Sequence, residues 1–280
     1  MMGLRVLFVI FSVATPPAAV SLTWGEVGNE VVEYVINSAD SMIAMFETYA
    51  TKDAELRADV KSLKHEQIME MNKDAKDVLK DVGTAVKDFY EWHPAMLECD
   101  AECVRDNNYD KPLSALRKIK LALTFVSEGL IKYRKSYTDA PGKLQQLKEQ
   151  AMSYTRNTEW AAIQFEGFGR LALTTTGGMT GYHTYSIAKR TAGYYNHYAE
   201  QFRRSHDSLE RTQRTTKRRA LALNGIYGTV LKIVRYLDDI KVDLECGRKC
   251  FEYAKRTLAG KLIKLYKKLG KQHDKCANKF

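Results

Sequence analysis

Four of the five cysteines stand in two pairs with the same spacing, and each pair follows a Leu-Glu dipeptide. The pairs are Cys99 with Cys103 and Cys246 with Cys250. Because three residues separate the cysteines of a pair, both sulfurs lie on one face of a helix, about one turn apart. Two such helices side by side would bring four sulfurs together, where they can form disulfides or bind zinc with all-cysteine ligation.

We expect disulfides rather than zinc, because the start of the chain predicts export to an oxidising compartment. Antiparallel helices would give Cys99–Cys250 and Cys103–Cys246, whereas parallel helices would give Cys99–Cys246 and Cys103–Cys250. The sequence leaves both patterns open, and either would join two distant segments covalently. Cys276 is left over, either as a free thiol on a frayed tail or as the link of a covalent homodimer.

Residues 1–21 have the features of a secretory signal peptide. Arg5 precedes an apolar run over 6–14, and Ala19-Val20-Ser21 fits a cleavage site of the small-x-small kind. The apolar run is well short of the roughly 20 residues that a membrane span needs. We therefore expect a secreted protein whose mature chain, 22–280, folds as a single all-α bundle.

Apolar residues at steps of three and four predict helices along the whole mature chain, and proline is absent from 142–280. We expect helices over about 25–92 and 110–137, a helix from 143 through at least 160, and helices over 182–223 and 226–270. The expected breaks are the turn at 138–142, a bend or loop over 174–178 and a break at Asn224-Gly225. No alternating stretch is long enough for a sheet, so the predicted fold is all-α: an elongated antiparallel bundle of about five to six helices, stapled by disulfides.

The net charge of +10 is unevenly distributed along the chain. Residues 22–110 hold 9 Lys/Arg against 20 Asp/Glu, whereas residues 201–280 hold 21 against 8. The structural interpretation is that an acidic first helix packs against basic later ones. The functional interpretation is a basic surface for anionic lipid, glycan or nucleic acid, of which nucleic acid fits an exported protein least.

Two segments are candidates for membrane contact. The first is the apolar, glycine-rich hairpin over 165–185, and the second is a basic amphipathic helix near the C-terminus, whose leucines have the alternative of packing inside the bundle. The candidate residues are Phe165, Phe168, Leu171, Leu173, Met179, Tyr182, Lys261, Lys264, Lys267 and Lys268. Long helices that flank an apolar hairpin resemble, in outline, the cytolysin A family of helical pore-forming toxins. This likeness involves no shared motif and carries over no residue.

No arrangement of residues predicts catalysis, a metal site or a cofactor. His65-Glu66 lacks the second histidine of a zinc-protease motif, and His206-Asp207-Ser208 places triad residue types at consecutive helical positions that point apart. We therefore expect a secreted, non-enzymatic protein that is membrane-active, of a toxin or defence type. The alternative is a secreted effector that binds an extracellular protein and has no membrane activity.

Overall fold

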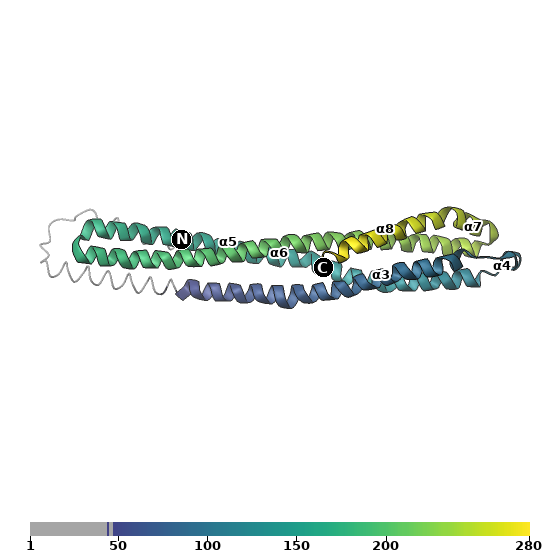
Figure 1. Ribbon diagram of the computed structural model, residues 1–280, viewed down its shortest axis with the longest axis horizontal. Coiled ribbons are helices and arrows are strands. Elements are labelled where there is room, and N and C mark those ends of the chain that lie inside the picture. The colour runs from purple at the N-terminus through teal and green to yellow at the C-terminus, as the bar shows by residue number, and fades with distance from the viewer. Residues whose placement is uncertain (1–43, 45–46) are drawn as a thin grey trace. The chain divides into compact units, whose positions relative to one another are not determined.

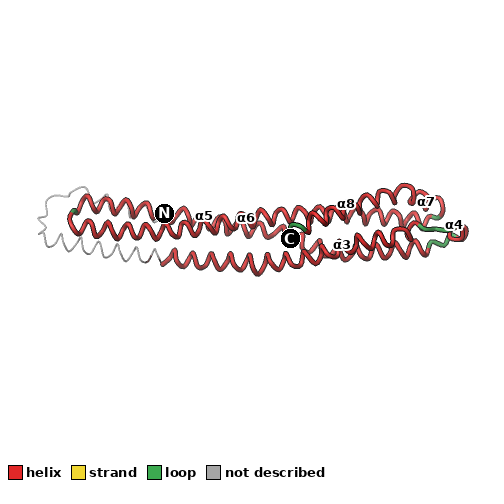
Figure 2. Tube along the Cα trace, in the orientation of Figure 1, coloured by secondary structure: helices red, strands yellow, loops and turns green. Residues whose placement is uncertain are grey.

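The computed structural model describes residue 44 and residues 47–280, so the predicted signal peptide and the start of the expected 25–92 helix lie outside the described residues. Within them the chain is helical apart from short connections and contains no strand, which confirms the all-α class (Figure 2). A helical stretch over 47–61 leads into the named elements (Figure 1). These are η1 (Ser62–Ile68, π-helical), α3 (Met69–Leu97), α4 (Ala101–Asp106), α5 (Asp110–Thr176), α6 (Gly178–Cys246), α7 (Arg248–Tyr253), η2 (Ala254–Leu258, π-helical) and α8 (Ala259–Ala277).

The described residues form two compact units. Unit 1 contains 161–195 with the described residues up to Thr51, and unit 2 contains 52–160 and 196–280. Helices α5 and α6 each contribute a part to both units. The expectation of one bundle over 22–280 stays a prediction, because its first residues are outside the described part.

Unit 1 is a hairpin made from the end of α5 and the start of α6. Gly177 and Gly178 form the turn with φ values of 54° and 57°, a left-handed conformation that glycine adopts without steric cost. The predicted bend is confirmed at these two glycines, but the threonines at 174–176 continue α5. Below the turn the two helices approach closely, since a Cβ on Gly169 would lie 2.9 Å from that of Ala188. A small core closes the base of the hairpin, where Tyr195 stacks on Phe165 with 5.3 Å between ring centroids.

Unit 2 is an antiparallel bundle, because residue numbers rise along one helix while they fall along its neighbour. Lys120 and Glu159 of α5 pair with Asp238 and Arg203 of α6. The chain reverses between α6 and α7, and α8 returns along α6 (Figure 1), where Thr229 donates a hydrogen bond of 2.7 Å to Gln272. The core runs along α3, α5, α6 and α8 and consists mainly of leucine, isoleucine, valine and aromatic side chains.

Helices α3 and α8 pack against each other, as the charge distribution predicts, but their contact is apolar. Phe89 and Tyr266 are both fully buried and stack with 3.6 Å between ring centroids. No ion pair joins α3 to α8 among the described residues. The apolar side chains of the two helices, rather than attraction between their opposite charges, therefore hold this pair together.

His93 makes the stability of this interface depend on pH. Its ring lies 4.8 Å from that of Phe89, and its Nε2 is buried without a hydrogen-bond partner. Burial lowers the pKa of His93 below the ordinary value of 6.5, so the unfolded chain binds the proton more tightly than the folded one. Stability is then fully present above pH 6.5 and is lost as the pH falls through the lower, folded-state pKa.

We expect the midpoint of urea unfolding to fall as the pH drops below about 6.5. The His93→Gln variant should lose the part of this decline that His93 causes, and His65→Gln, which changes an exposed histidine, should keep it. Equal pH profiles for the native protein and His93→Gln would contradict the assignment.

The turn predicted at 138–142 is wrong, because α5 continues through Pro141. The buried side chains of Tyr137, Ala140 and Leu144 keep the helical apolar face unbroken across the proline. Gln213 of α6 also donates a hydrogen bond of 3.1 Å to the carbonyl oxygen of Pro141. Packing on both sides therefore outweighs the one backbone hydrogen bond that proline removes. Pro94 likewise lies inside α3, which continues to Leu97.

The break predicted at Asn224-Gly225 is also wrong, because α6 is continuous to Cys246. The neighbouring side chains of Leu223 and Ile226 are buried in the core, and Gly225 lies against Gln272 of α8. The actual break comes at Gly247, whose φ of 100° only glycine adopts readily. It lies between the two cysteines of the second pair.

Both predicted disulfide patterns are wrong, because each cysteine bonds to the other member of its own pair. The disulfides are Cys99–Cys103 and Cys246–Cys250, with Cα atoms 5.4 Å and 5.8 Å apart. The prediction assumed that each pair lies within one uninterrupted helix. Instead, the first cysteine of each pair precedes a helix start and the second lies in the first turn of the new helix.

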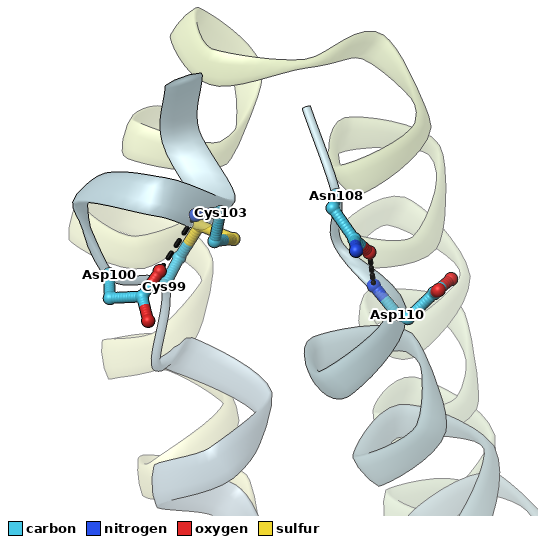
Figure 3. Close-up of a disulfide and its surroundings, with 5 residues drawn as sticks. All are labelled: Cys99, Asp100, Cys103, Asn108 and Asp110. Carbon is cyan, nitrogen blue, oxygen red and sulfur yellow. Dashed lines mark hydrogen bonds between the residues drawn. A yellow bond between two sulfur atoms is a disulfide. The ribbon is translucent and has the colours of Figure 1, made fainter. Parts of the chain in front are cut away.

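The start of α4 shows how the chain geometry permits this pairing. Asp100 caps the helix, and its side chain accepts a hydrogen bond of 2.7 Å from the backbone N–H of Cys103 (Figure 3). Gly247 occupies the equivalent position at the start of α7. The segment between α4 and α5 meets the end of α6 in unit 2, where Asn107, Tyr109, Cys246 and Gly247 line a cavity of about 400 Å³.

Tryptic mapping without reduction distinguishes these bonds from the predicted ones. Cleavage leaves Cys99 and Cys103 in one peptide, 88–105, which should be lighter than its reduced form by two hydrogens and linked to nothing. Cleavage at Arg248 and Lys249 should leave 242–248 joined to 250–255. A peptide 88–105 that is bonded to either of these would contradict the structure. Because each loop is short, we expect the loss of one disulfide to lower the free energy of unfolding by only about 2 kcal/mol.

Cys276 is the remaining cysteine, and it lies within α8 rather than on a frayed tail. It is only 1% exposed, and burial raises the pKa of its thiol to about 11. A buried, protonated thiol exchanges slowly with disulfides. The covalent homodimer through Cys276 stays a prediction.

Candidate functional site

The hairpin tip of unit 1 is the strongest candidate site. From Leu171 to Ala188 the sequence contains no Asp, Glu, Lys or Arg, and this range covers the last residues of α5, the glycine turn and the start of α6. We call this range the uncharged tip. Four of the predicted membrane-contact side chains within it are at least 40% exposed: Leu171, Leu173, Met179 and Tyr182.

Met179 is the most exposed of these side chains, at 91%, because it follows the turn directly. An unbranched apolar side chain at this position contacts little of the protein and adapts readily to another surface. The structure places Phe165 differently, in the small core against Tyr195, and Phe168 is half-buried. The exposed apolar surface is therefore concentrated nearer the turn than the predicted 165–185 range.

Two hydroxyl groups of the uncharged tip bond within their own helices. Thr174 donates to the carbonyl of Leu171 at 2.9 Å, and Thr184 donates to that of Thr180 at 3.0 Å. A hydroxyl that already has a partner costs much less to remove from water than one without. Thr174 and Thr184 therefore add less polarity to the tip than the sequence suggests.

Charged residues border the uncharged tip on both helices. Arg170 precedes it on α5, Lys189 and Arg190 follow it on α6, and all three are exposed. Glu166 is the nearest acidic residue on α5 and is also exposed. The border is thus mainly basic, which the pattern of apolar residues does not reveal. The sequence does show it in another way, because cations stand at both ends of a stretch without charged residues.

The second predicted membrane segment, α8, has its apolar face turned into unit 2. Leu262, Tyr266 and Leu269 are fully buried in the core, so the leucines follow the alternative of packing inside the bundle. The predicted contact lysines are all exposed on the opposite face: Lys261, Lys264, Lys267 and Lys268. While α8 remains packed, its exposed surface is cationic rather than amphipathic.

One group of potential metal ligands occurs in the described part of the chain. Ligand atoms of His206, Asp207 and Glu210 lie within 4.8 Å of one another. Glu210 already accepts a hydrogen bond of 2.6 Å from Arg214, and His206 Nδ1 lies 3.2 Å from Asp207. Several exposed arginines follow on the same helix, and their charge opposes the binding of a cation. This group therefore does not fit a metal centre well.

None of the described helices has a stretch both long and apolar enough to span a bilayer. The chain matches no protein-family model. It also has no significant match among curated proteins.

Proposed function

We propose that this chain is an exported, non-catalytic helical protein that binds and perturbs membranes through the uncharged tip. The observation that carries the proposal is the exposed apolar surface of that tip, with Met179 at its end and no charged residue from Leu171 to Ala188. Exposed apolar side chains gathered at the end of a hairpin are typical of a surface that is buried in a complex or a membrane.

The length of the uncharged tip suits one leaflet of a bilayer. At about 1.5 Å per residue, its α6 part from Gly178 to Ala188 extends about 15 Å along the helix axis. The hydrocarbon core of a bilayer is about 30 Å thick. The turn would therefore reach roughly the middle of the bilayer before Lys189 and Arg190 arrive at the headgroups.

The residues at the border favour anionic lipid. Each Lys or Arg near an anionic surface contributes about 1 kcal/mol of attraction. Arg170, Lys189 and Arg190 together exceed the single opposing Glu166. Tyr182, which is 66% exposed, adds an aromatic ring with a polar end, which suits the interface between headgroups and hydrocarbon.

Vesicle assays test the proposal directly. The protein, with its disulfides intact, is mixed with dye-loaded vesicles of neutral lipid alone or of neutral lipid with phosphatidylserine. We expect sedimentation with the anionic vesicles and leakage of their dye, and much weaker effects on the neutral ones. The absence of both binding and leakage would refute membrane activity and leave the alternative, an exported effector that binds another protein.

A further inference from the structure

The exposed face of α8 carries a row of like charges. Its lysines follow one another at alternating steps of three and four residues, so they share one side of the helix. The members of this row, which we call the lysine ladder, are Lys261, Lys264, Lys268, Lys271 and Lys275. All of them are exposed, and the ladder is about 21 Å long at the helical rise of 1.5 Å per residue.

No carboxylate in the described part of the chain forms an ion pair with the lysine ladder. Lys261 lies over the ring of Tyr236, 5.7 Å from its centroid. Asp274, the acidic residue of α8, is 77% exposed and lies beside His273. Because like charges three or four residues apart on a helix repel each other, the ladder carries an electrostatic cost that a bound anion would relieve.

The basic surface continues onto α6 at the end of α8. The Nε atom of Arg219 donates a hydrogen bond of 2.7 Å to the carbonyl oxygen of Lys279, which holds the two segments together. Lys217 and Arg218 precede Arg219 and are exposed, and neither forms an ion pair with a described residue. Arg219 therefore lies beside the residues that follow α8.

The buried face of α8 determines which kind of anion suits the ladder. Because Leu262, Tyr266 and Leu269 pack in the core, the helix cannot lay an apolar face into lipid. Its exposed face consists mainly of flexible cationic side chains along a straight line, which matches a linear polymer with regularly repeated negative charges. We propose that the lysine ladder binds a sulfated polysaccharide. This proposal rests on one part of the proposed function, the export of the protein. Because an exported protein rarely meets nucleic acid, a polysaccharide is the more suitable polyanion.

Heparin serves as the probe. The binding of the intact protein is measured by calorimetry at physiological salt and at several higher salt concentrations. A triple variant, Lys264→Gln with Lys268→Gln and Lys271→Gln, removes the middle of the ladder. We expect this variant to bind heparin at least about tenfold more weakly than the native protein does. Its affinity should also depend less steeply on salt, because fewer counterions are released.

The matched control makes the same change in charge on α3. Lys73→Gln, Lys76→Gln and Lys80→Gln alter exposed lysines that alternate with Asp74, Asp77 and Asp81. This variant should bind heparin with nearly native affinity. Equal losses in the two triple variants would show that net charge alone governs binding, and would overturn the proposal. A native protein that does not bind heparin at physiological salt would overturn it as well.

Two further measurements separate the polysaccharide from other partners. Desulfated heparin should bind the native protein far more weakly than heparin, and this comparison requires no variant. Vesicles with phosphatidylserine test the lipid. If the ladder variant loses vesicle binding but keeps its affinity for heparin, the ladder serves a membrane surface and the polysaccharide proposal fails. If it loses heparin binding and still binds vesicles, the proposal is supported independently of the uncharged tip.

Discussion

Replacing Met179 with glutamate is expected to weaken binding to anionic vesicles roughly 50-fold and to abolish dye leakage. The side chain is 91% exposed at the end of the hairpin, so the change removes almost no contact within the protein. In the membrane-bound state, however, a carboxylate would replace an apolar side chain at the deepest point of insertion. Placing a charge inside a bilayer costs about 2–3 kcal/mol, which corresponds to the expected loss of affinity.

Two matched variants identify the cause of this loss. Met179→Leu keeps an apolar side chain and should bind vesicles like the native protein. Met152→Glu makes the same substitution at an exposed methionine of unit 2, 44% exposed, and should also leave vesicle binding unchanged. All of these variants should unfold at the native temperature. Native binding and leakage by Met179→Glu would refute insertion through the uncharged tip.

The second large effect concerns the contact between α3 and α8. Replacing Phe89 with alanine should lower the free energy of unfolding of unit 2 by about 3–5 kcal/mol. The side chain is fully buried and stacks on Tyr266, so its removal leaves a cavity between the two helices. Urea unfolding followed by circular dichroism measures the change. A shift of the midpoint at an unchanged slope would show that stability, rather than the extent of unfolding, has changed.

Phe125→Ala is the control for this prediction, because it makes the same substitution at a phenylalanine of α5 that is 63% exposed. Its effect should stay below about 1 kcal/mol. Tyr266→Phe tests the opposite side of the stacked pair. It keeps the ring and removes a buried hydroxyl that has no hydrogen-bond partner, so stability should be unchanged or slightly higher. Similar losses for Phe89→Ala and Phe125→Ala would show that the stacked pair is not a core contact.

The local sequence could predict the helical class and the bend of the hairpin. Apolar residues at steps of three and four allow only helices to bury one face, and the structure contains such helices over the described residues. The glycine pair at 177–178 could be recognised because a left-handed turn depends on these residues themselves rather than on distant contacts. The uncharged tip could also be recognised, because the absence of charge is read directly from consecutive residues.

The breaks at 138–142 and 224–225 could not be judged from the local sequence. Proline and glycine weaken a helix by an amount that packing elsewhere can exceed, and here Gln213 and the buried side chains beside Pro141 supply that packing. The local sequence likewise could not decide whether the leucines of α8 are buried in the bundle. The sequence showed an amphipathic helix, but only the tertiary contacts with α3 decided that its apolar face lies in the core.

The cysteines show most clearly what the local sequence determines and what only the tertiary structure determines. Their spacing alone determined that the two sulfurs of a pair would lie on one face of a helix, about one turn apart, if that helix continued. Which sulfur bonds to which depended on where a new helix begins, at Asp100 and Gly247. Helix starts are set by caps and by the packing of the neighbouring segments, so only the folded chain determined that each disulfide closes within its own pair.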